Sequence, residues 1–220
     1  MTLLVPSVLD DFRTRAAQRL RSEPPGFLQV VPRGDHSLDR APSPADATPP
    51  RPAAVLVPIV MREGAPAILL TERATGLRTH SGQIAFPGGR MDETDASPTE
   101  TALREAEEEI GLDRRYVEPL GYLDAYLSSS NYFVVPTVAL VSPDHDLRLN
   151  PHEVADVFEV ALDFLMQEIN HELHCREWRG GVRQYYAMPF GSRYIWGVTA
   201  GILRNMYERL YAAPLEYAPR

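Results

Sequence analysis

The chain has 220 residues, of which 44% are hydrophobic and 24% are charged, and its formal net charge at pH 7 is −8. This composition suits a globular protein with a well-buried core, and the lack of a long basic run argues against a broad nucleic-acid surface. The acidic balance does not exclude an anionic substrate, because bound metal ions can reverse the sign of the local field.

The first twenty residues have no basic region followed by a long apolar run, which argues against a targeting peptide. No stretch of the sequence is apolar for long enough to span a membrane. Cys175 is the single cysteine, so the chain does not demand an oxidising compartment and offers no cysteine-rich zinc site. We therefore expect a cytoplasmic protein that binds neither membranes nor nucleic acids.

The N-terminal part is expected to hold a helix and a connector. Apolar residues at helical spacing, namely Leu9, Phe12, Ala16 and Leu20, predict an amphipathic helix over residues 7–21. The next segment is too rich in proline for a regular helix and predicts an extended connector. No catalytic motif precedes residue 53. We therefore divide the chain into a helix plus proline-rich connector, residues 1–52, and one mixed α/β domain, residues 53–220.

The domain is expected to alternate strands and helices, because short apolar runs are separated by turn signals. Strands are predicted at residues 53–61, 65–73, 83–87, 118–128, 132–141, 172–178 and 182–188. The first two strands and the last two strands are expected to form hairpins. Residues 154–166 predict a strand that passes into a short helix. An apolar stripe formed by Ile195, Val198, Ile202, Met206 and Leu210 predicts a helix over residues 194–211.

A central helix is predicted from Pro98 to Ile110, with clear signals at both ends. Ser97 can cap its N-terminus, Pro98 suits the first helical position, and Glu100 can complete a capping box. Gly111 can supply the left-handed cap at the C-terminal end.

This helix carries a dense group of carboxylates. Glu105, Glu108 and Glu109 stand at positions i, i+3 and i+4, so they project from one face and repel one another. Carboxylate oxygens are hard ligands that suit Mg²⁺ or Mn²⁺. The alternative is a solvated acidic face. The helix, however, follows the turn Phe86-Pro87-Gly88-Gly89, where glycine lets the backbone approach a ligand closely, and the combination predicts a metal and phosphate site.

Residues 89–112, GRMDETDASPTETALREAEEEIGL, resemble the Nudix box, whose second half reads R-E-U-x-E-E-x-G-U with U an apolar residue. Residues 104–112 match this half at every position. Upstream, Asp95 stands where a glutamate is usual, and one extra residue separates it from Arg104. The same lengthened box occurs in the coenzyme A pyrophosphatase family.

That family has a second signature, which resembles L-L-T-x-R-[SA]-x3-R-x3-G-x3-F-P-G-G. The chain meets every fixed position, with Leu69, Leu70, Thr71, Arg73, Ala74, Arg78, Gly82, Phe86, Pro87, Gly88 and Gly89. Further resemblance lies at residues 126–128, 150–154 and 195–197, so it covers about residues 53–205.

The resemblance implies an α/β fold, the Nudix α/β/α sandwich with a mixed sheet, and hydrolysis of a nucleoside diphosphate linked to another group. Glu105 and Glu109 are the expected ligands of Mg²⁺ or Mn²⁺, and Glu108 is a third ligand or the base that orients water. Arg104 is expected to hold a glutamate in place rather than to touch the substrate.

Substrate contacts are expected from Arg73, Arg78 and the backbone of Gly88 and Gly89, one of whose carbonyls would complete the metal shell. A guanidinium fork suits phosphate, although a surface salt bridge is the alternative for either arginine. Glu153 is either a further ligand or base, or the cap of a helix. Four aromatic residues, Tyr185, Tyr186, Phe190 and Trp196, are expected in the core rather than as an adenine platform.

The leading interpretation is a coenzyme A pyrophosphatase that releases 4′-phosphopantetheine and adenosine 3′,5′-bisphosphate. A pyrophosphatase for ADP-ribose, NADH or nucleotide sugars is the second interpretation, and the chain lacks the four-cysteine zinc site of one NADH-cleaving branch. The third is a nucleotide-binding protein that has lost catalysis. Such a protein would be expected to lack one of Glu105, Glu108 and Glu109, and all three are present.

Overall fold

The computed structural model describes residues 7–26, 33–34, 36–39, 48–76, 80–178 and 181–212. None of the helices in these ranges has the length and apolar character needed to cross a membrane. The strands are β1 (Arg51–Val60), β2 (Ala67–Arg73), β3 (Ile84–Ala85), β4 (Gly88–Arg90), β5 (Val117–Tyr122), β6 (Tyr126–Leu127), β7 (Tyr132–Val141), β8 (Val154–Ala161), β9 (Glu172–Trp178), β10 (Gly181–Phe190) and β11 (Arg193–Trp196). The α-helices are α1 (Val8–Arg19), α2 (His36–Asp39), α3 (Pro98–Ile110), α4 (Leu162–Leu165) and α5 (Val198–Leu210).

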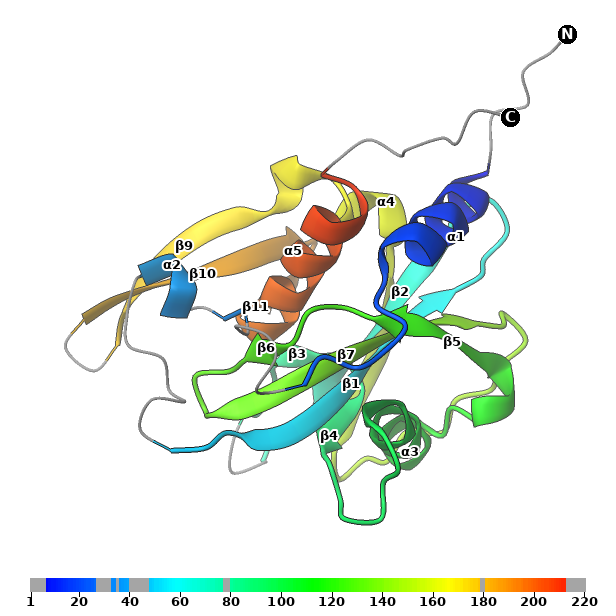
Figure 1. The fold of residues 1–220 in the computed structure, drawn as a ribbon, viewed down its shortest axis with the longest axis horizontal. Coiled ribbons are helices and arrows are strands. Elements are labelled where there is room, and N and C mark those ends of the chain that lie inside the picture. The colour runs from blue at the N-terminus through cyan, green and yellow to red at the C-terminus, as the bar shows by residue number, and fades with distance from the viewer. Residues whose placement is uncertain are drawn as a thin grey trace, which may run out of the picture.

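The larger of two sheets is mixed and holds β1 and β7 as a parallel pair at its centre (Figure 1). The pair runs in register from Arg51 opposite Tyr132 to Val60 opposite Val141. β2 and β5 lie antiparallel on either side of this pair, and β8 pairs with β2. Strands covered on both faces carry nearly continuous apolar runs, which explains the composition of β1 and β7.

Helices cover both faces of this sheet (Figure 1). On one face α3 packs on β1, and Ala106 and Ile110 join Leu56 in an apolar cluster. On the other face Val57 joins Met206 of α5 in a second cluster. Successive side chains of a strand point to opposite faces, so one strand contributes to both layers of the core. The predicted α/β/α sandwich with a mixed sheet is confirmed.

The smaller sheet is antiparallel, has the order β11-β10-β9, and corrects one prediction. Residues 193–196 form β11 and pair with β10, so the helix predicted over residues 194–211 begins only at Val198. Gly197 has a φ of 63°, and this left-handed conformation separates strand from helix. Ile195 belongs to β11 but is fully buried in the same core as α5. Its apolar side chain therefore matched the spacing of the predicted helix although it lies in a strand.

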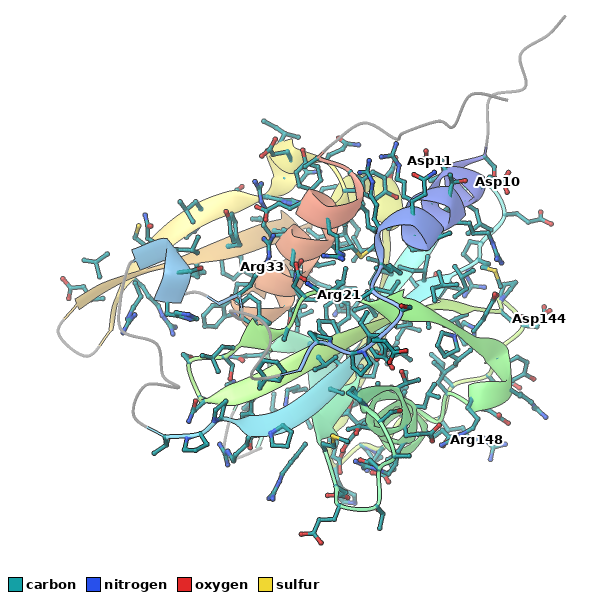
Figure 2. All side chains as sticks on the ribbon, in the orientation of Figure 1. Asp10, Asp11, Arg21, Arg33, Asp144 and Arg148 are labelled. Atoms are coloured by element: carbon teal, nitrogen blue, oxygen red, sulfur yellow. The ribbon has the colours of Figure 1, made fainter. Side chains whose placement is uncertain are left out.

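The segment predicted as an extended connector is not wholly extended, because α2 forms one helical turn within it. Ion pairs tie the chain before β1 to the core: Asp124, between β5 and β6, contacts Arg21, at the end of the predicted helix, at 2.9 Å and Arg33, in the predicted connector, at 3.6 Å. Arg209 of α5 contacts the same carboxylate at 3.1 Å. Figure 2 labels Arg21 and Arg33 beside α5.

The predicted N-terminal helix is α1, which packs on the same core as α5 (Figure 1). Phe12 is fully buried and Ala16 nearly so. The guanidinium of Arg19 donates to the carbonyl of Leu210 at 2.8 Å, where the last turn of α5 leaves carbonyl groups without helical partners.

Replacing Phe12 with alanine is expected to lower the free energy of unfolding by about 3–5 kcal/mol, because it removes a fully buried ring and leaves a cavity. Val8→Ala on the same helix removes a side chain that is 44% exposed and should change stability by at most about 0.5 kcal/mol. Urea unfolding measures both variants. Equal and small losses would contradict the packing of α1 in the core.

Candidate active site

Local signals set the ends of α3 as the sequence predicts. Ser97 caps the helix, with its hydroxyl accepting the backbone N–H of Glu100 at 3.2 Å, and Pro98 is the first helical residue. Gly111 is left-handed, with a φ of 66°, and its N–H reaches carbonyls of the last turn. The Glu100 carboxylate accepts from Arg114 at 3.0 Å, and no bond from the Ser97 N–H to it is seen among the described residues, so the predicted capping box is only half formed. These ends fix which residues of α3 face the sheet.

A glycine turn brings backbone against the carboxylates of α3. Gly88 and Gly89 form part of β4, which pairs with β1. Gly88 has a φ of 155°, and a Cβ atom there would lie 2.5 Å from the carbonyl oxygen of Ala54. A Cβ atom on Gly89 would lie 2.5 Å from the carboxyl carbon of Glu105. Gly88 therefore needs glycine, because both its φ and the neighbouring backbone exclude a side chain, and Gly89 lies directly against the carboxylate of Glu105.

Three carboxylates are close enough in this region to act on one another. Glu109 is only 4% exposed, and one of its oxygens accepts the N–H of Gly88 at 3.1 Å. Burial, together with the charges of Glu105 and Glu153, raises the pKa of Glu109 to about 7. Burial likewise raises the pKa of Glu105. The site therefore concentrates negative charge in a place that disfavours it without a counter-charge.

Arg104 holds this acidic group in place, as the sequence predicts, and does so through several carboxylates. Its guanidinium donates to Glu105 at 2.9 Å and to Glu108 at 3.1 Å. It also contacts both oxygens of Asp95, at 3.1 and 3.0 Å. Glu108 is the outer member of the group, with its side chain 56% exposed.

The structure shows which residues Asp95 contacts, which the resemblance to the Nudix box had left open. Its side chain is 6% exposed, and besides Arg104 it accepts from the Thr101 hydroxyl at 2.9 Å and the Asp92 N–H at 2.9 Å. The Arg104 guanidinium holds the pKa of the Asp95 carboxyl well below its usual range. Asp95 thus positions Arg104. The signal in the sequence was an acid near the usual place, displaced by one residue.

Arg73 reaches the same carboxylates from the end of β2. Its Nη1 atom lies 3.6 Å from an oxygen of Glu109, and its side chain is 27% exposed. Its Nε atom is buried and has no hydrogen-bond partner among the described residues. Of the substrate-binding residues predicted, the structure therefore brings Arg73, Gly88 and Gly89 together. Arg78 lies outside the described residues.

Glu153 joins the site through the turn before β8. No helix begins there, so the helix-cap alternative for this residue is wrong. Its backbone carbonyl accepts the N–H of Ala74 at 2.8 Å, which fixes the turn beside the residue that follows Arg73. After burial and the other neighbouring charges, the Glu153 carboxylate contributes to the raised pKa of both Glu105 and Glu109.

The four aromatic residues predicted in the core divide between two environments. Tyr186 and Phe190 pack against the main core. Tyr185 and Trp196 instead contact each other at 5.4 Å between ring centroids, with the Arg176 guanidinium 4.9 Å from the Trp196 ring. Alternation along β10 explains the division, because Tyr185 and Tyr186 point to opposite faces of the smaller sheet.

The donors at this site fit a hard divalent cation, although the side chains need to turn to bind it. Glu105, Glu109 and Glu153 offer carboxylate oxygens, and the glycine turn offers backbone oxygens. No three Asp, Glu, His or Cys side chains in the described ranges are already arranged to hold a metal ion. The oxygens of Glu105 and Glu108 are held by Arg104 instead. A divalent cation fits this site because it would relieve the mutual repulsion of the Glu105, Glu109 and Glu153 carboxylates.

Comparisons with known proteins agree with this geometry. A family model described as the NUDIX domain matches residues 50–177. The Nudix hydrolase NudL of Escherichia coli strain K12 is 41% identical over 165 residues, which cover 74% of this chain and 85% of that protein. A solved MutT/nudix family protein from Enterococcus faecalis matches 80% of this chain and 72% of its own, with a TM-score of 0.50 and 16% identity. That structural likeness supports the fold alone.

Proposed function

The chain belongs to the Nudix hydrolase family, and from this premise we propose that it hydrolyses the pyrophosphate bond of coenzyme A with Mg²⁺ or Mn²⁺ as its metal ion. Water would be added across one P–O–P bridge, which releases 4′-phosphopantetheine and adenosine 3′,5′-bisphosphate. The pyrophosphohydrolase chemistry rests on the family. The choice of coenzyme A rests on the signature between residues 69 and 89.

The position of Arg73 carries the proposal. Arg73 belongs to that signature, and its guanidinium lies 3.6 Å from Glu109 of the Nudix box. The signature ends in Gly88 and Gly89, which meet Glu109 and Glu105. Two separate parts of the signature, Arg73 and the Gly88-Gly89 pair, therefore meet the acidic helix, so residues that select a substrate would stand beside residues that hold the metal.

The proposed roles follow from these contacts. Glu105 and Glu109 would hold the metal ion, with Glu108 or Glu153 as a further ligand or as the base that orients water. A divalent ion bound there masks the charge of a pyrophosphate and makes a water molecule more acidic. Arg104 contacts the carboxylates of Glu105 and Glu108 and would keep both side chains near the metal ion after they turn toward it.

Arg73 would donate to a pyrophosphate oxygen and so fix the phosphorus atom relative to the carboxylates. A guanidinium is suited to this because its charge does not depend on pH near neutrality. The N–H of Gly88 would remain with Glu109, which it already holds in place.

A substrate panel tests the proposal. Purified protein with Mn²⁺ is assayed against coenzyme A, ADP-ribose, NADH and a nucleotide sugar, and kcat/KM is compared. Coenzyme A should have the highest value. A preference for ADP-ribose or NADH would keep the Nudix chemistry and reject the proposed substrate, whereas binding without turnover of any member would support a non-catalytic protein.

Replacing Arg73 with alanine is expected to lower kcat/KM about 10- to 150-fold, the scale of one charge-assisted contact. Since Arg73 lies beside Glu109 and hence beside the scissile bridge, the loss should be equal for coenzyme A and for dephospho-coenzyme A. Steady-state kinetics on the two substrates measures this.

The matched control for this variant is Arg115→Ala. Arg115 pairs with Asp113 at the surface, with its side chain 70% exposed, so its loss should leave kcat/KM unchanged. A loss in Arg73→Ala that is confined to coenzyme A would show that Arg73 recognises the 3′-phosphate instead of the pyrophosphate.

A further inference from the structure

Arg193 connects the smaller sheet to the larger one. It is the first residue of β11, and its Nη1 atom donates to Glu72 of β2 at 3.0 Å. Its Nη2 atom donates to Asp156 of β8 at 2.5 Å. The guanidinium carbon lies 3.7 Å from the ring centroid of Phe158, also on β8. One side chain therefore bridges two neighbouring strands of the other sheet.

The two carboxylates that Arg193 bridges stand directly opposite each other. Glu72 and Asp156 are partners in the antiparallel pair of β2 and β8. Like charges at opposite positions destabilise such a pair. The Arg193 guanidinium offsets this repulsion and lowers the pKa of Asp156. Without Arg193, this rung of the β2–β8 pair would be expected to be less stable.

The register of β2 and β8 shifts at the next rung. Arg73 pairs with Val154, so Ala155 is left out of the ladder. A β-bulge of this kind bends a strand and changes the direction of its side chains. Past the bulge, Arg73 lies beside Glu109, and Ala74 donates to the carbonyl of Glu153. The bulge therefore lies where Arg73, at the end of β2, and Glu153, just before β8, come close to the carboxylates of α3.

We propose that Arg193 is a positioning residue: by bridging Glu72 and Asp156 it holds the β-bulge that aims Arg73 at the candidate active site. This inference rests on the proposed function, in which Arg73 binds the pyrophosphate. Arg193 itself contacts neither the acidic residues of α3 nor the glycine turn through any hydrogen bond or ion pair recorded for the described residues. It acts through Arg73.

A double-variant cycle between Arg193 and Arg73 tests the proposal. Arg193→Met alone should lower kcat/KM for the preferred pyrophosphate substrate by about tenfold, within the range for residues that share one network. In the Arg73→Ala background the same change should have a clearly smaller effect, because the substrate-binding group that Arg193 positions is already gone. Arg193→Lys keeps the charge without the fork and should fall between the wild type and Arg193→Met.

Arg62→Met is the matched control. Arg62 contacts Glu159 of β8 at 3.1 and 2.6 Å. Glu159 pairs with Leu69 of β2, several residues away from the bulge. This variant also removes an arginine–carboxylate pair from β8, but kcat/KM should not change. Mn²⁺ affinity should be equal in wild type and Arg62→Met, since this variant leaves both the bulge and the carboxylates of α3 intact.

Hydrogen exchange gives a readout that does not depend on turnover. In Arg193→Met, amides of residues 71–74 and 153–156 should exchange faster than in wild type, while those of α3 should not. If Arg193→Met folds poorly, Arg193→Lys carries the same kinetic cycle.

The outcomes separate this inference from the proposed function. Equal losses from Arg193→Met in the wild-type and Arg73→Ala backgrounds would overturn the positioning role and leave the role of Arg73 intact. No loss from Arg193→Met would also overturn it. If Arg73→Ala has no effect, the proposed role of Arg73 fails first, and the positioning role fails with it.

Discussion

Hydrolysis is expected to stop when EDTA removes divalent cations and to return when Mg²⁺ or Mn²⁺ is added in excess. The physical reason is the charge of the site: in the proposed arrangement a polyanionic pyrophosphate would have to approach Glu105, Glu109 and Glu153, whose charges already disfavour one another. Substrate and site repel each other unless a cation lies between them. Product release with time, measured by chromatography, gives the rate in each condition.

A circular dichroism spectrum in EDTA serves as the control, because the fold should survive the loss of the metal. The core is built on the two faces of the larger sheet, and its apolar clusters do not include the acidic group. Undiminished hydrolysis in metal-free buffer would reject a metal-dependent mechanism at these carboxylates.

Glu109→Gln is expected to lower kcat by at least about 10²-fold, the scale for loss of one electrostatic catalytic group. Glutamine has nearly the same shape, and its amide can still accept the N–H of Gly88. What the variant loses is the charge that would hold the metal. Kinetics at saturating Mn²⁺ and a Mn²⁺ titration should show the loss in both rate and metal affinity.

Glu107→Gln provides the matched control on the same helix. Glu107 pairs with Arg114 at 2.9 Å, on a different side of α3 from the glycine turn, so kcat should stay close to that of wild type. Thermal unfolding should show that Glu109→Gln remains folded, because burial already disfavours the charged form of Glu109 and raises its pKa to about 7. A normal rate in Glu109→Gln would show that the site lies elsewhere.

The features that the sequence predicted well are those set by local physics. The N-cap hydroxyl of Ser97 and the left-handed Gly111 act within one helical turn, so both ends of α3 could be placed from the residues themselves. The spacing of Glu105, Glu108 and Glu109 likewise follows from helix geometry. The nearly continuous apolar runs of β1 and β7 also identify them from the residues alone as strands covered on both faces.

The features that the sequence did not show depend on contacts between distant segments. Asp95 binds Arg104 only because the loop before α3 folds back on the helix. Glu153 reaches the site through a turn that a β-bulge between β2 and β8 brings into place. Arg193 lies more than a hundred residues from Glu72 along the chain, and no periodicity signals that pair. The strand at residues 193–196 was not predicted because Ile195 fits the helical spacing of α5 as well as the alternation of β11.

The most direct test of the central claim is the identity of the products. Wild-type protein is incubated with coenzyme A and Mn²⁺ in water enriched in ¹⁸O, and the products are separated and weighed by mass spectrometry. The account predicts 4′-phosphopantetheine and adenosine 3′,5′-bisphosphate, with a single ¹⁸O atom in a phosphate of one of them. Intact coenzyme A under conditions in which ADP-ribose is cleaved, or products of any bond other than the pyrophosphate bridge, would contradict it.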